Sequence, residues 1–300
     1  MTKTEYQKFA GVYALMLTPY HDDLTVNYDA YAAYTEFQVS TGAGHLFAVC
    51  GTSEMAELTL DEREKLAKLT VKYASGTPVV ATANMEPSWF AQVEEVKRMS
   101  QTGVDGLVFV TKGMHDDPER QFTYLNELAQ HTELPLLLYE FPGCQPHKME
   151  AEVYKRLVDT GRFVGIKDTT SNMKDICEKI DVQGDSNILQ ANVPLLLEAW
   201  KAGARGVMAT PTSCGAQLFQ RMWEEFTAGD LDAAHITIQY INHLDNAIDS
   251  GFNVSAKYLV QLQGVEGMKP INRGNRTLSE PRMQSLRTYY DWAKSKGLAF

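Results

Sequence analysis

Short apolar runs alternate along the chain with longer segments whose apolar residues have helical spacing. Most of the short runs are continuously apolar, which is typical of parallel strands that are buried on both faces. Because a helical segment follows each run, the pattern predicts repeated strand–helix units. The eight predicted strands are Val12–Leu17, Leu46–Val49, Val79–Thr82, Leu107–Val110, Leu136–Tyr139, Val164–Lys167, Ile188–Gln190 and Val207–Ala209.

Residues that begin and end helices lie between the predicted strands. Thr59 and Glu62 have the spacing of a capping box, and Asp117-Pro118 supplies an N-cap followed by a first-turn proline. Eight strand–helix units can close into a (β/α)8 TIM barrel of the α/β class. Periodicity also allows an open doubly wound sheet, and the count of eight favours the barrel. Glycines suited to end helices precede the next strand at Gly76, Gly103, Gly161 and Gly203.

The part of the chain after about residue 215 has helical patterning and no further strong strand. Its predicted helices are Leu218–Phe226, Leu231–Ile248 and Ser255–Gln263. We therefore expect a barrel over residues 1–225 and a helical C-terminal extension over residues 226–300. No linker rich in Pro, Gly or Ser separates them, so the extension should pack on the barrel within a single structural domain.

Composition and charge narrow the classes of function. A formal net charge of −10 disfavours nucleic acid or an anionic membrane as partner, because phosphate binding needs clustered Lys and Arg. No stretch reaches the roughly 18 apolar residues of a membrane helix, and the N-terminus lacks the apolar core of a signal peptide. The four scattered cysteines suggest neither a disulfide framework nor a zinc site. We expect a cytoplasmic protein.

Two reactive side chains end predicted strands, namely Tyr139 and Lys167. The carboxyl ends of barrel strands meet at the catalytic face, so these two side chains can meet there. Burial lowers the pKa of a lysine and favours the free amine that attacks a carbonyl, while a nearby phenol can relay protons. The alternatives are a solvent-directed Lys167 paired with Asp168 and a Tyr139 that only packs.

The turn after the second predicted strand is a third candidate. Gly51, Thr52 and Ser53 offer backbone N–H groups and hydroxyls that can hold a carboxylate without a formal charge. Such a turn is weak evidence by itself, because the same residues serve ordinary turns.

Several common classes of site lack their motifs. The seven histidines form no HxH or HExxH pattern, so we expect no metal and no other cofactor. No GxSxG elbow and no GxGxxG loop occurs, which disfavours a serine hydrolase and a dinucleotide-binding enzyme.

These residues resemble the motifs of the dihydrodipicolinate synthase and N-acetylneuraminate lyase superfamily of class I aldolases. The resemblance extends from about Gly11 to Gly264. Its most specific element, Gly165–Ser171, is similar to the strand that carries the Schiff-base lysine. Tyr139–Pro142 resembles the catalytic tyrosine motif, and Gly51–Glu54 resembles the carboxylate-binding turn.

The resemblance implies a metal-independent lyase on a TIM barrel. Its substrate would be pyruvate or another 2-keto acid, bound as a lysine imine. Lys167 would form the imine, Tyr139 would relay protons, and Thr52 and Ser53, beside Gly51, would bind the carboxylate. The resemblance also implies a homotetramer or a homodimer.

Departures from the family pattern bear on the second part of the substrate. The turn Gly51–Glu54 lacks one residue of the usual Gly-Thr-Thr-Gly-Glu, Cys144 lies near the place of an arginine, and residues 111–118 hold no tyrosine pair. The motif after the seventh strand is Gln190-Ala191-Asn192 instead of the family's usual glycine–acid sequence, so the distal substrate contacts also differ. Ala191 is our candidate substrate-binding residue there. We expect cleavage, condensation or dehydration of a 2-keto-3-deoxy acid, with 4-hydroxy-tetrahydrodipicolinate synthase proper as the alternative.

Two further alternatives stay open. A non-catalytic barrel could bind a keto acid, although simple binding needs neither a nucleophile nor a proton relay. A pyridoxal-phosphate barrel could use Lys167 for the cofactor imine, although no distinct phosphate-binding glycine cluster follows the last predicted strands.

Overall fold

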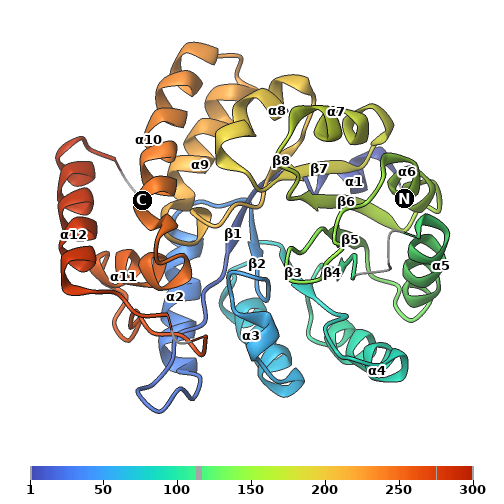
Figure 1. Ribbon diagram of the computed structural model, residues 1–300, viewed down its shortest axis with the longest axis horizontal. Helices are drawn as coiled ribbons and strands as arrows, with labels where there is room; N and C mark the ends of the chain where they lie inside the picture. The colour runs from blue at the N-terminus through green and yellow to red at the C-terminus, as the bar shows by residue number, and fades with distance from the viewer. Residues whose placement is uncertain (1, 113–116, 275, 299–300) are drawn as a thin grey trace. The chain divides into compact units, whose positions relative to one another are not determined.

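The computed structural model describes residues 2–112, 117–274 and 276–298. Its eight strands, β1 to β8, form a closed barrel in chain order, and each pairing between neighbours within a unit is parallel (Figure 1). The prediction of a (β/α)8 barrel is therefore confirmed, and the open doubly wound sheet is excluded. The chain divides into two compact units, one of Met1–Gly11 with Val79–Met208 and the other of Val12–Pro78 with Ala209–Phe300.

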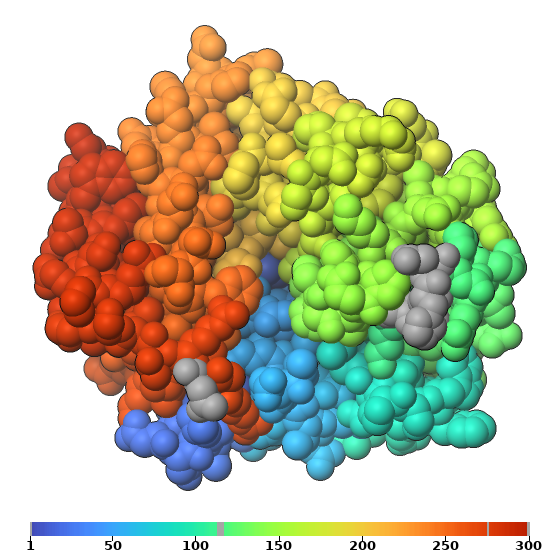
Figure 2. Space-filling model, in the orientation of Figure 1, coloured from blue at the N-terminus to red at the C-terminus, as the bar shows by residue number. Residues whose placement is uncertain are grey.

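The first unit holds six strands and the helices between them. Helices α5, α6 and α7 lie side by side on the outside of their strands (Figure 1). Figure 2 shows the side chains of this unit, coloured green to yellow, packed closely over the face in view. Its elements are α1 (Lys3–Gln7), β3 (Val79–Thr82), α4 (Trp89–Ser100), β4 (Gly106–Val110), α5 (Pro118–Ala129), β5 (Leu136–Tyr139), α6 (Ala151–Asp159), β6 (Phe163–Asp168), α7 (Met173–Val182), β7 (Asn187–Gln190), η2 (Val193–Leu195), α8 (Leu196–Ala202) and β8 (Gly206–Val207).

The second unit holds two strands and the remaining helices. The three helices predicted after residue 215 are present as parts of α9, α10 and α11, and α12 follows them. Its elements are β1 (Gly11–Leu15), α2 (Tyr28–Ser40), β2 (His45–Phe47), η1 (Met55–Glu57), α3 (Leu60–Tyr73), α9 (Thr212–Thr227), α10 (Leu231–Asp249), α11 (Asn253–Leu262) and α12 (Glu280–Ser295). The division into a barrel over residues 1–225 and an extension over residues 226–300 stays a prediction.

Burial explains why the strands appear as apolar runs. Every residue of β3 to β8 is buried, so neither face of these strands selects for polar side chains. Three strands end two residues earlier than predicted. Met16 and Leu17 after β1, Ala48 and Val49 after β2, and Met208 and Ala209 after β8 are buried but lie in irregular backbone.

The predicted caps at Thr59, Asp117 and Gly203 are confirmed. The C-caps of α3, α4 and α6 are Ala74, Gln101 and Thr160, so Gly76, Gly103 and Gly161 lie one or two residues beyond the caps. Thr59 Oγ1 accepts from Glu62 N–H, and Glu62 Oε2 accepts from Thr59 N–H, which completes the capping box of α3. Asp117 caps α5 ahead of Pro118. Gly203 ends α8 with φ of 119°, a conformation that side-chain-bearing residues rarely adopt. In the described ranges, no helix combines the length and apolarity that crossing a membrane requires.

Candidate active site

Lys167 and Tyr139 lie together at the carboxyl ends of neighbouring strands in the first unit. The register of β5 and β6 pairs the two residues directly. Lys167 Nζ lies 4.3 Å from the centre of the Tyr139 ring, and each residue is only 4% exposed. Lys167 is therefore not directed to solvent. A buried amine beside a phenol can attack a carbonyl and exchange protons with its neighbour.

The backbone around this pair is held by the adjoining strands. Tyr139 C=O accepts from Thr111 N–H at 3.0 Å, and Lys167 C=O accepts from Glu140 N–H at 3.3 Å. Gly165 lets β6 approach β7 closely, since a Cβ at this position would lie 2.7 Å from Asn187 O. The glycine of the lysine strand is thus required by packing.

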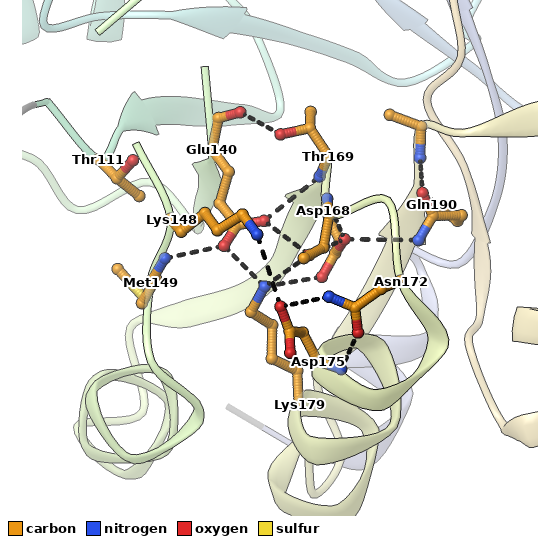
Figure 3. A network of polar contacts seen from close by, with 12 residues as sticks. Thr111, Glu140, Lys148, Met149, Asp168, Thr169, Asn172, Asp175, Lys179 and Gln190 are labelled. Atoms are coloured by element: carbon orange, nitrogen blue, oxygen red, sulfur yellow. Dashed lines mark hydrogen bonds and ion pairs between the residues drawn. The ribbon is translucent and has the colours of Figure 1, made fainter. Parts of the chain in front are cut away.

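A buried ion cluster is built on the residues that directly follow Tyr139 and Lys167 in the chain, Glu140 and Asp168 (Figure 3). Lys179, from α7, donates from Nζ to Glu140 Oε1 at 2.6 Å and to Asp168 Oδ2 at 2.8 Å. It also donates to Thr170 Oγ1 at 3.0 Å. Glu140 and Asp168 are fully buried, and Lys179 is 2% exposed. We call Glu140, Asp168 and Lys179 the buried triad.

Further hydrogen bonds complete the buried triad. Met149 N–H donates to Glu140 Oε1 at 2.8 Å, and Thr170 Oγ1 donates to Asp168 Oδ1 at 2.5 Å. Burial raises the pKa of Glu140, the attraction of Lys179 opposes this, and the repulsion of Asp168 adds to it. Burial alone would lower the pKa of Lys179, but the attraction of the two carboxylates outweighs it and raises that pKa. Lys179 therefore stays protonated at neutral pH.

Sequence reasoning missed the buried triad. The only available signal was an acidic residue directly after each of Tyr139 and Lys167, and Asp168 was considered as a partner of Lys167 rather than of Lys179.

Ala191 follows β7 in the same unit. Its N–H lies 2.9 Å from Asp168 O and 2.8 Å from Gln190 Oε1, so its backbone is fixed beside the end of the lysine strand. A role of Ala191 in substrate binding stays a prediction.

The Gly51–Glu54 turn belongs to the second unit. Ser53 Oγ donates to Met16 O at 2.6 Å and accepts from Cys50 N–H at 3.0 Å, so this hydroxyl holds the turn itself. Thr52 Oγ1 lies 3.3 Å from Thr210 Oγ1, a hydroxyl pair in which either oxygen can donate. Thr52 is thus the better of the two hydroxyls to offer a bond to a carboxylate.

A second buried ion pair fixes the end of this turn. Glu54 has φ of 65°, an unusual backbone conformation for a side-chain-bearing residue. Its Oε1 accepts from Lys257 Nζ at 2.6 Å, and its Oε2 accepts from Arg273 N–H at 3.0 Å. Burial raises the pKa of Glu54 and lowers that of Lys257, and each shift is opposed by the partner's charge.

Possible metal ligands do not converge in the described ranges. Among residues 2–112, 117–274 and 276–298, no three His, Cys, Asp or Glu side chains are grouped so that they could hold a metal ion.

A buried lysine against a tyrosine at the strand ends of a TIM barrel provides the nucleophile and the acid–base group that a class I aldolase needs. The sequence model of the Dihydrodipicolinate synthetase family matches residues 8–287, and the chain belongs to this family. The family resemblance expected from the sequence is therefore confirmed.

The relatives match nearly the whole chain. The 4-hydroxy-tetrahydrodipicolinate synthase of Oceanobacillus iheyensis is 26% identical over 261 residues, which cover 86% of this chain and 88% of the relative. The fold matches YagE, a prophage protein of E. coli K12 solved in complex with pyruvate, with a TM-score of 0.87. That similarity has 20% identity and covers 97% of this chain and 99% of YagE. CdNal of Clostridium difficile, solved with mannosamine, gives a TM-score of 0.88 at 17% identity over 95% of this chain and 99% of CdNal.

Proposed function

We propose that the protein is a lyase that binds pyruvate or a 2-keto-3-deoxy acid as an imine of Lys167. The observation that carries this proposal is the 4.3 Å contact between buried Lys167 Nζ and the Tyr139 ring. Membership of the Dihydrodipicolinate synthetase family supports it. The pyruvate complex of YagE, which shares the fold, agrees with a keto acid as ligand.

Imine formation needs a free amine and a route for protons. Lys167 Nζ attacks the C2 carbonyl carbon, and the new C–N bond gives a carbinolamine whose oxygen leaves as water. Burial of Lys167 favours the uncharged amine. We assign to the Tyr139 phenol the transfer of protons from nitrogen to the departing oxygen.

The imine then allows either of two bond-breaking steps. In aldol cleavage the C4 hydroxyl gives its proton to a base, the C4 carbon becomes the carbonyl of an aldehyde, and the electrons of the broken C3–C4 bond move toward the protonated imine nitrogen and leave an enamine. In dehydration a base takes a proton from C3, a proton is given to the C4 hydroxyl, and this group departs as water to leave a C3=C4 double bond conjugated with the imine. Protonation of the enamine at C3 and hydrolysis of the imine return pyruvate and free Lys167 after cleavage.

We assign the carboxylate to the turn of Gly51, Thr52 and Ser53, and a distal contact to Ala191. The turn has no acidic side chain before Glu54, and Lys257 neutralises Glu54.

We further propose that the enzyme works in the cytoplasm as a homotetramer or a homodimer, without a nucleic-acid or membrane partner. The acidic net charge supports the absence of a nucleic-acid or membrane partner, and the scattered free cysteines support a reducing compartment. The oligomeric state rests on the family resemblance alone.

A second candidate is the 4-hydroxy-tetrahydrodipicolinate synthase reaction, which the name of the Oceanobacillus iheyensis relative favours. The two are separated by steady-state assays of wild type and Lys167→Ala. We expect turnover of one or more 2-keto-3-deoxy acids, at least 100-fold faster than the synthase reaction, and its loss in the variant. Faster synthase turnover would support the second candidate, and no turnover of either kind by folded protein would contradict both.

A further inference from the structure

Glu140 and Asp168 directly follow the proposed catalytic residues Tyr139 and Lys167. Successive side chains of a strand point to opposite faces. Tyr139 and Lys167 share one face, as their contact requires, so Glu140 and Asp168 point to the face that α7 covers. Lys179 of α7 meets them there (Figure 3).

Lys179 joins the ends of two neighbouring strands through a single nitrogen. Glu140 follows β5, Asp168 ends β6, and Nζ of Lys179 lies within 2.8 Å of a carboxylate oxygen on each. A second link crosses the same gap, because Thr169 Oγ1 donates to Glu140 O at 2.6 Å. Glu140 and Asp168 each lie one residue after Tyr139 and Lys167. The contacts that hold Glu140 and Asp168 together therefore also fix the position of Tyr139 relative to Lys167.

Stability alone does not account for the buried triad. A buried ion cluster loses hydration, and well-packed apolar residues often give equal or greater stability. What ions supply is a fixed geometry, since a single Nζ of Lys179 binds one oxygen of each carboxylate and so ties the two strand ends to each other.

We propose that Lys179 is a positioning residue, which holds Glu140 and Asp168 together on one face and thereby sets the placement of Tyr139 and Lys167 on the other. The inference rests on the proposed imine chemistry at Lys167. Lys179 itself contacts no substrate in this account.

The test compares Lys179→Met with the matched control Lys174→Met, which removes an exposed lysine from the same helix. Samples are quenched with borohydride at increasing times, which gives the rate constant of imine formation at each pyruvate concentration. The two quantities compared are the rate constant at saturating pyruvate and the pyruvate concentration that gives half of it. If Lys179→Met lacks a cooperative unfolding transition, the same rates are measured on the triple variant Glu140→Gln, Asp168→Asn, Lys179→Met. That variant contains no unpaired buried charge.

We expect the saturating rate constant to fall by at least about 10-fold, because a small misplacement of reacting groups is costly. The half-saturating pyruvate concentration should stay within about threefold, since the carboxylate turn is unchanged. A role in stability alone would leave the rate per folded molecule unaltered, so a smaller fall in a folded variant overturns the proposal. If folded wild-type protein forms no adduct, the proposed function fails instead.

Discussion

Lys167 Nζ lies 4.3 Å from the centre of the Tyr139 ring, with both residues almost completely buried. The two strands that carry them are paired in register at this point. An amine and a phenol placed in this way can exchange protons while a carbonyl is converted to an imine. The relationship makes Tyr139 the first residue to test beside Lys167.

Tyr139→Phe should keep the ring against Lys167 and remove only the hydroxyl. We expect kcat to fall by roughly 100- to 10,000-fold, the range of a lost general acid–base group. Borohydride trapping should still mark Lys167, because the nucleophile remains. A kcat within twofold of wild type would show that the phenol carries no proton in the reaction.

Thr52→Val should remove a hydroxyl from the turn to which we assign the substrate carboxylate, without changing the shape of that turn. We expect KM for the keto acid to rise by about 10-fold or more, the effect of one hydrogen bond to a charged group. Ser53→Ala provides the comparison. Because the Ser53 hydroxyl donates to Met16 O, the substitution Ser53→Ala should lower the free energy of unfolding by about 1 kcal/mol. An unchanged KM in Thr52→Val would remove this threonine from the site.

Lys257→Met should leave the Glu54 carboxylate buried without its counter-charge. We expect the free energy of unfolding to fall by about 3–5 kcal/mol in denaturant titrations. Adding Glu54→Gln should recover most of the loss. The control is Lys269→Met, which removes a lysine whose partner Asp22 is exposed, and its effect should stay below about 1 kcal/mol. Equal losses in the single and double variants would contradict the pairing.

Asp245→Asn should stabilise the protein in a pH-dependent way. Burial, together with the charge of Asp249, raises the pKa of Asp245 to about 6. The folded state therefore binds more protons than the unfolded state between about pH 4 and pH 6, and this carboxyl lowers stability as pH rises through that window. We expect the variant to gain about 1 kcal/mol at pH 7.5, discounted for partial exposure, and much less at pH 4. An equal gain at both pH values would contradict this.

The barrel fold and the adjacency of Tyr139 and Lys167 could be predicted from the sequence for physical reasons. Strands buried on both faces must be continuously apolar, so the runs ending in Tyr139 and Lys167 were visible, and their adjacency followed from the order of a parallel barrel.

The two buried lysines that pair with Glu140 and Glu54 could not be predicted in this way. Lys179 meets Glu140 across 39 residues of sequence, and Lys257 meets Glu54 across 203. Each lies in a helix whose pattern is compatible with an exposed lysine. Only the tertiary fold brings such partners together, because local spacing carries no information about them.

Borohydride trapping with pyruvate, followed by intact mass and peptide mapping, tests the central claim most directly. We predict one reduced pyruvyl group per chain, on Lys167. It should be lost in Lys167→Ala and kept in Lys155→Ala, which changes an exposed lysine of α6. Folded wild-type protein that forms no adduct, or an adduct on a different lysine, would contradict the assignment of Lys167 as the imine-forming residue.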